Sequence, residues 1–174
     1  MNRIRLRSGA AGAALLLISL AGCDRLRPPE LTLPTDAQAA EFYRSHDAVE
    51  HVAVNGTIVE VRVRQPASQL RRGGALWAKV GPYIYLFSPD TEKLLQAYSG
   101  VAAVRVTTVT DGDREVSRVM LRRDALSDIL WRRSQNLLGH ALQRGTEQPR
   151  LLEHLIDWGE EYTEYEYSPE FVSR

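Results

Sequence analysis

Alternating apolar and polar positions predict a β-hairpin early in the chain. Residues 49–64 alternate in this way around the dipeptide Asn55-Gly56. Asn-Gly readily adopts the two positive φ angles of a type I′ turn. A two-residue loop at this dipeptide pairs Val52 with Val59 and places most of the valines on one face.

A second hairpin is expected over residues 101–121, around Asp111-Gly112. A strict two-residue loop would set two arginines opposite each other, which is unfavourable. A three-residue loop with a bulge avoids this and pairs Val106 with Val116. We therefore expect the bulged form.

A third pair of strands, 76–80 and 83–87, is expected around Gly81-Pro82, after a polar loop over residues 65–74. Helices are expected at residues 37–45, after a capping box of Thr35 and Gln38, and at 89–98, after Ser88-Pro89. Two more are expected at residues 124–141 and from Gly145-Thr146 to Gly159, with Pro149 in the first turn of the last one. Because the strands come in neighbouring pairs, the pattern predicts an α+β fold: a mainly antiparallel sheet of three hairpins, with helices packed on one face.

The C-terminal residues 160–174 interleave glutamate with tyrosine. The residues with which this tail would contact a partner are Tyr162, Glu164, Tyr165, Glu166 and Tyr167. Tyrosines favour packing, whereas a run of glutamates favours solvent. Two hypotheses follow: the tail packs back over the domain, or it docks on a protein of the cell envelope.

The N-terminus is typical of an export signal. Arg3, Arg5 and Arg7 precede 14 uncharged positions, residues 9–22. A membrane-spanning helix needs about 20 apolar residues, so this segment is too short to be one.

Leu20-Ala21-Gly22-Cys23 closely resembles the bacterial lipobox, the motif at which lipoprotein signal peptides are processed. The resemblance implies that Cys23 receives a lipid on its sulfur and becomes the first residue of the mature chain. In the enterobacterial sorting pattern, an aspartate at the next position, here Asp24, implies retention in the inner membrane. An ordinary secretory signal and a buried helix of a cytosolic domain are the alternatives.

The chain therefore divides into four expected parts. Residues 1–22 form the signal peptide, 23–36 a proline-rich lipidated tether, 37–159 a single α+β domain, and 160–174 the acidic, tyrosine-rich tail. The domain would face the periplasm or the cell exterior, and its length is sufficient for one hydrophobic core.

Charge suggests what the domain contacts. Without residues 1–22 the chain has 19 basic and 22 acidic residues, a net charge of −3, yet residues 62–150 carry 15 basic against 8 acidic residues, or +7. The arginines expected to bind an anionic lipid or glycan are Arg62, Arg64, Arg71 and Arg72. Nucleic acid is not an expected partner of an exported chain with this net charge.

No motif indicates catalysis, a cofactor or a metal. The chain has one cysteine, so disulfides and zinc–thiolate sites are excluded if Cys23 is lipidated. The adjacent side chains of Ser45-His46-Asp47 point apart, unlike those of a catalytic triad, and His154 with Asp157 lacks a third metal ligand. We expect a non-catalytic, membrane-anchored envelope lipoprotein that acts as a protein-interaction or structural module. The alternatives are a module that binds anionic lipids or glycans and, third, an enzyme.

Overall fold

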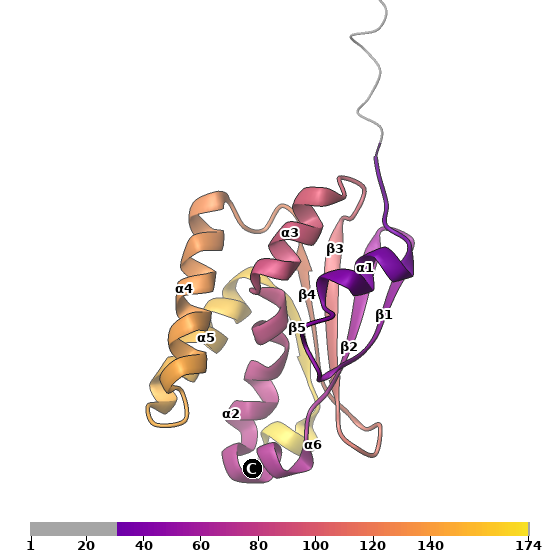
Figure 1. Cartoon of the computed structure of the whole chain (residues 1–174). Coiled ribbons are helices and arrows are strands. Elements are labelled where there is room, and N and C mark those ends of the chain that lie inside the picture. Colours follow the sequence, from indigo (N-terminus) through magenta and orange to yellow (C-terminus); the bar gives the residue numbers. More distant parts are fainter. Residues whose placement is uncertain (1–30, 174) are drawn as a thin grey trace, which may run out of the picture. The chain divides into compact units, whose positions relative to one another are not determined.

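The computed structural model describes residues 31–173, which form an α+β fold around a five-stranded mixed sheet (Figure 1). Leu31–Arg174 separates as one compact unit that contains its own hydrophobic core, so we expect this unit to fold independently. The elements are α1 Asp36–Phe42, β1 Val49–Asn55, β2 Ile58–Arg64, α2 Ala67–Leu86, α3 Pro89–Ala97, β3 Ala103–Val109, β4 Glu115–Arg122, α4 Asp128–Arg144, α5 Pro149–Tyr162, β5 Glu164–Tyr167 and α6 Pro169–Val172. The lipobox, with Cys23 and Asp24, lies outside the described residues.

The strands follow the spatial order β1-β2-β3-β4-β5. Neighbours are antiparallel except β2 and β3, which run parallel. The parallel pair arises because α2 and α3 connect the end of β2 to the start of β3, as a crossover must. The expected α+β class is confirmed, but the expected set of three hairpins is wrong.

The first hairpin forms with a shifted register. The turn residues are Gly56 and Thr57, and Asn55 pairs with Ile58. Gly56 has φ 61° whereas Thr57 has no positive φ, so the turn is not type I′. Val52 pairs with Val61, a shift of two positions from the expected pairing. Because the shift is even, the expected apolar face is retained.

The expected third hairpin is replaced by helix α2. Leu76, Val80, Tyr83 and Phe87 are spaced by four, three and four residues, which fits one helical face as well as two short strands. Val80, Tyr83 and Phe87 are fully buried. Sequence periodicity alone did not separate the two structures, and tertiary burial favours the helix.

Glycine and proline, which the sequence places at expected turns, instead lie inside α2. Gly74 has φ 54° and ψ −142° and marks a kink within the helix, and Pro82 lies eight residues further along. The expected polar loop 65–74 is thus mostly helical. The first turns of α2 precede the kink at Gly74, and the rest of the helix follows it.

The second hairpin has the expected bulge in a different register. Val106 pairs with Val119, not Val116, and the bulge lies between Thr108 and Val109. The loop is also longer than expected. It is closed by a hydrogen bond of 2.9 Å from Thr110 N to the carbonyl oxygen of Arg114. Because this shift of three positions is odd, the side chains of β4 lie on the opposite face of the sheet from the one that the expected pairing gives them.

The C-terminal residues complete the sheet. Helix α5 continues through Gly159, its expected end, to Tyr162, and β5 then pairs antiparallel with β4. Glu166 lies opposite Arg118. Hence the tail residues Glu164–Tyr167 are a strand of the domain.

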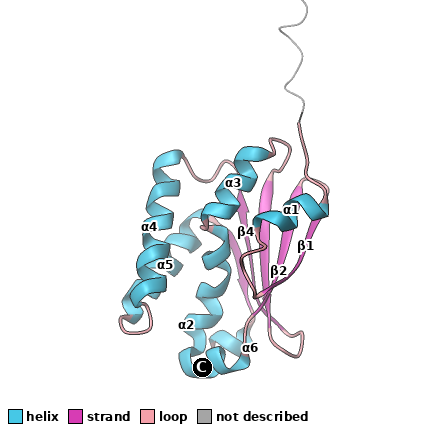
Figure 2. Cartoon of the chain, viewed as in Figure 1, coloured by secondary structure: helices cyan, strands magenta, loops and turns pink. Residues whose placement is uncertain are grey.

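The buried face of the sheet is built from alternating valines. Val59, Val61, Val104 and Val106 are at most 1% exposed, and the helices cover this side of the sheet (Figure 2). Among the described residues, no helix is both long and apolar enough to cross a membrane.

Candidate ligand-binding site

The four arginines expected to bind anions lie on two elements. Arg62 and Arg64 are on β2, and Arg71 and Arg72 are on the first turns of α2. Strand alternation places Arg62 and Arg64 on the same side of the sheet, away from the valine core. The two pairs have different surroundings.

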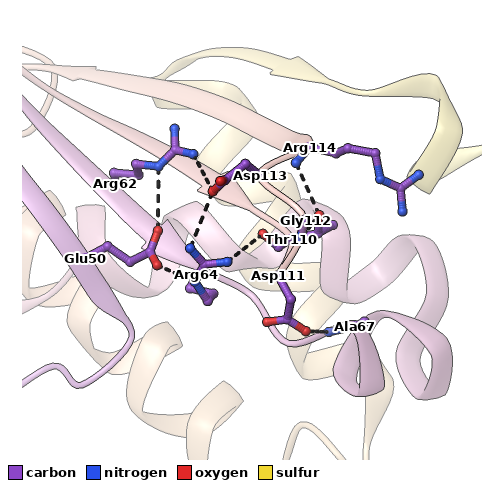
Figure 3. A network of polar contacts seen from close by, with 9 residues as sticks. All are labelled: Glu50, Arg62, Arg64, Ala67, Thr110, Asp111, Gly112, Asp113 and Arg114. Carbon is purple, nitrogen blue, oxygen red and sulfur yellow. Dashed lines mark hydrogen bonds and ion pairs between the residues drawn. The ribbon is translucent and has the colours of Figure 1, made fainter.

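Arg62 and Arg64 form an ion-pair network with Glu50 and Asp113 (Figure 3). Asp113 Oδ1 lies 2.9 Å from Nη2 of Arg62 and 3.4 Å from Nη2 of Arg64. Arg64 Nε donates to Glu50, and its Nη1 donates to the carbonyl oxygen of Thr110 at 3.1 Å. All three guanidinium nitrogens of Arg64 therefore have protein partners.

The network favours its own carboxylates over an added anion. The hydrogen bond from Arg62, together with the charge of Arg64, lowers the pKa of Asp113. The hydrogen bond to Glu50 raises the pKa of Arg64. Asp113, the residue held by both arginines, has φ 58°, so the contacts hold a strained turn between β3 and β4 against β2. Arg62 and Arg64 thus connect this turn to β2 and to Glu50 of β1.

A cavity of about 540 Å³ opens between α2 and the ends of β2 and β3. Its apolar wall contains Ala48, Val63, Trp77, Ile84 and Tyr85. Its polar wall contains Arg64, Gln65, Ser68, Gln69 and Arg72. Small-molecule sites typically enclose about 300–1,000 Å³ and combine an apolar lining with a few polar groups. This cavity has both properties.

Arg72 is the cation of this cavity that is available to a ligand. Its side chain is exposed, and its Nε donates to the carbonyl oxygen of Ser68 at 3.4 Å. Within residues 31–173, Arg72 forms no ion pair. Its terminal nitrogens can therefore bind an anionic group at the cavity rim.

The adjacent Arg71 lines a different hollow, of about 170 Å³, together with Glu170 and Phe171. In that hollow Arg114 pairs with Glu170 and lies over the Phe171 ring, 5.4 Å from its centroid. The two neighbouring arginines thus face different surroundings, although each contributes the same charge.

Deep in the cavity lies Gln65, which sequence analysis did not select. It is 4% exposed. Its Nε2 donates to the carbonyl oxygen of Trp77 at 2.7 Å, and its backbone N–H to that of Val109 at 2.7 Å. Its Oε1 is buried and has no hydrogen-bond partner within residues 31–173. A glutamine that follows a strand carries no sequence signal for such a role.

Most of the tail residues proposed for partner binding lie at the edge of the sheet. The Tyr167 hydroxyl is 2.7 Å from that of Tyr83, and the ring of Tyr162 packs 4.5 Å from Trp158. Tyr165 is 47% exposed, and Glu164 and Glu166 are exposed. Edge strand β5 therefore offers an accessible surface, while Tyr162 at the end of α5 and Tyr167 in β5 contact other residues of the domain.

Of the histidines considered in the sequence, His46 follows α1 and His154 lies on α5. His46 Nε2 lies 3.0 Å from Asp90 Oδ2, so its partner is not the adjacent Asp47. His154 and Asp157 share a shallow surface hollow. No group of three candidate metal ligands occurs among the described residues.

Comparison of this chain with protein-family models, curated proteins and solved structures finds no significant match. Function is therefore inferred from the geometry of the cavity and its surroundings.

Proposed function

We propose that this chain is a lipid-anchored, non-catalytic envelope lipoprotein whose domain binds a small amphipathic anion in the α2 cavity. The supporting observation is the cavity itself, in which an apolar wall meets Arg72, an arginine that forms no ion pair with the described residues. The anionic-ligand hypothesis thus takes precedence over protein docking, with Arg72 as its cation.

The energetics favour a ligand with an alkyl chain. Burying each methylene contributes about 0.8 kcal/mol before the entropic cost of binding. An exposed ion pair with Arg72 contributes about 1 kcal/mol or less. The apolar wall therefore supplies most of the affinity, and Arg72 orients the ligand with its charge at the rim.

Calorimetric titration of residues 31–174 with dodecanoate, below its micelle concentration, tests this proposal. We expect Arg72→Ala to weaken binding by about fivefold, equivalent to about 1 kcal/mol, and to reduce its salt dependence. Arg71→Ala is the matched control, because it removes the same charge from the same helix outside the cavity. Absence of binding, or an equal loss in both variants, would reject the proposal.

Membrane anchoring through Cys23 is a separate part of the proposal. Incorporation of labelled palmitate into the full chain should be abolished by Cys23→Ala. Asp24 would retain the protein in the inner membrane if enterobacterial sorting applies. Persistent labelling of the Cys23→Ala chain would exclude the lipobox assignment.

Docking of an envelope protein on β5 is the second candidate function. It is favoured by the exposed Tyr165 on an edge strand, whose unpaired backbone groups can accept another strand. A photo-reactive residue at position 165 should cross-link a specific envelope protein, whereas the same residue at exposed Arg132 should not.

A further inference from the structure

The buried Oε1 of Gln65 is a hydrogen-bond acceptor that no described residue supplies with a donor. Buried polar side-chain atoms nearly always have a partner, so each exception calls for an explanation. Because Gln65 lines the cavity, a bound molecule can supply the missing donor.

The surrounding contacts hold this acceptor in place. Nε2 of Gln65 is engaged by the carbonyl oxygen of Trp77, and turning the amide over would bring two acceptor oxygens together. The nearby Thr108 hydroxyl pairs with that of Ser117 at 2.7 Å. Neither neighbour satisfies Oε1.

Gly81 keeps the space beside the acceptor open. A Cβ at this position would lie 3.2 Å from Gln65 Oε1 and 3.3 Å from Thr108 Cγ2. Any larger residue at position 81 would crowd Oε1. Glycine at this position therefore keeps a side chain away from Oε1.

The donor must be uncharged, because the cavity lining contains no carboxylate to balance a buried ammonium group. A hydroxyl or an amide N–H meets this requirement. The charge at the rim and the donor in the interior thus belong to two different groups of one ligand.

Building on the proposed function, we propose that Gln65 selects the ligand: an acyl-chain amphiphile with one anionic group at Arg72 and a hydroxyl or amide N–H that donates to Gln65 Oε1. A site that offers a buried acceptor discriminates against an analogue without the donor, since the acceptor then stays unpaired.

The test compares dodecanoate with 3-hydroxydodecanoate and 12-hydroxydodecanoate on residues 31–174. We expect at least one hydroxylated acid to bind about tenfold more tightly than dodecanoate. Gln65→Met, which keeps the length of the side chain, should abolish this preference. The readout is the ratio of the affinity for a hydroxylated acid to the affinity for dodecanoate. A variant that weakens the binding of all three acids equally leaves this ratio unchanged.

Gly81→Ala provides a second variant in which Gln65 remains. Its methyl group should reduce the preference by crowding Oε1, whereas Gly139→Ala, with nothing within 4 Å of the added Cβ, should leave it unchanged. Binding of dodecanoate through Arg72 with no preference for either hydroxylated acid would overturn this inference and leave the proposed function intact. A preference that survives Gln65→Met would also overturn it. No binding of any of these acids would reject the proposed function as well.

Discussion

Substitution of Gly159 by alanine should destabilise the domain, although alanine is the better helix former. The added Cβ would lie 2.6 Å from Tyr83 Cζ and closer still to two other atoms of that ring. Tyr83 cannot easily move away: it is fully buried, stacks 5.7 Å from Phe87 and bonds through its hydroxyl to Tyr167. The substitution therefore tests how α5 packs on α2.

The magnitude follows from three contributions. Replacing a mid-helix glycine by alanine gains about 0.5–1 kcal/mol. Overpacking a core costs about 1–3 kcal/mol, and displacement of Tyr83 from its hydrogen bond costs about 1 kcal/mol more. We expect the free energy of unfolding to fall by about 2 kcal/mol in Gly159→Ala.

Urea unfolding of residues 31–174 measures this change, and Gly139→Ala is its control. Gly139 lies inside α4, where an added Cβ meets nothing within 4 Å. The free energy of unfolding of this control should therefore rise by about 0.5–1 kcal/mol. A Gly159→Ala domain at least as stable as the Gly139→Ala domain would refute the packing of α5 against Tyr83.

The remaining predictions concern the tail strand and the turn network. Tyr167→Phe should lower the free energy of unfolding by about 1 kcal/mol because the hydrogen bond to Tyr83 is lost, whereas exposed Tyr165→Phe should leave it unchanged. Burial raises the pKa of Tyr83 to about 12, so the stability it contributes should be complete below about pH 10 and fall as the pH rises towards 12, as measured by unfolding at each pH. The hydrogen bond from Arg62 lowers the pKa of Asp113, so the stability that Asp113 contributes should be present above about pH 4 and lost on further acidification. In acid unfolding, the free energy of unfolding of Asp113→Asn should therefore fall less steeply with decreasing pH. A profile identical to that of the unsubstituted domain would contradict the ion pairs.

Local signals predicted the elements whose cause is local. Ser88 accepts a hydrogen bond from Thr91 N, with Pro89 in the first turn of α3. The expected capping box of Thr35 and Gln38 also forms, at the start of α1. Caps and tight turns depend on a few neighbouring residues, and for this reason the sequence revealed them.

Register and helix ends were harder to predict because they depend on distant partners. Gly159 resembles a helix stop, yet α5 continues because this glycine allows close contact with Tyr83. The tail residues are stabilised by pairing with β4, which no pattern within the tail reveals.

The candidate site shows the same limit. Two of the arginines proposed from the sequence, Arg64 and Arg72, line the cavity. The sequence did not show that Arg64 is held by Glu50 and Asp113. Nor could it reveal the unpaired acceptor of Gln65, because hydrogen-bond satisfaction depends on atoms that only the folded chain brings together.

The sequence by itself determined the hairpin at Gly56, the apolar faces of its strands and the caps of the early helices. Tertiary structure alone decided that residues 76–87 form a helix, that β2 and β3 run parallel, and that β5 joins the sheet. The physical reason is that turns and caps are settled by local φ angles and short-range hydrogen bonds. The choice between helix and strand in a short apolar run is settled by which surface buries it.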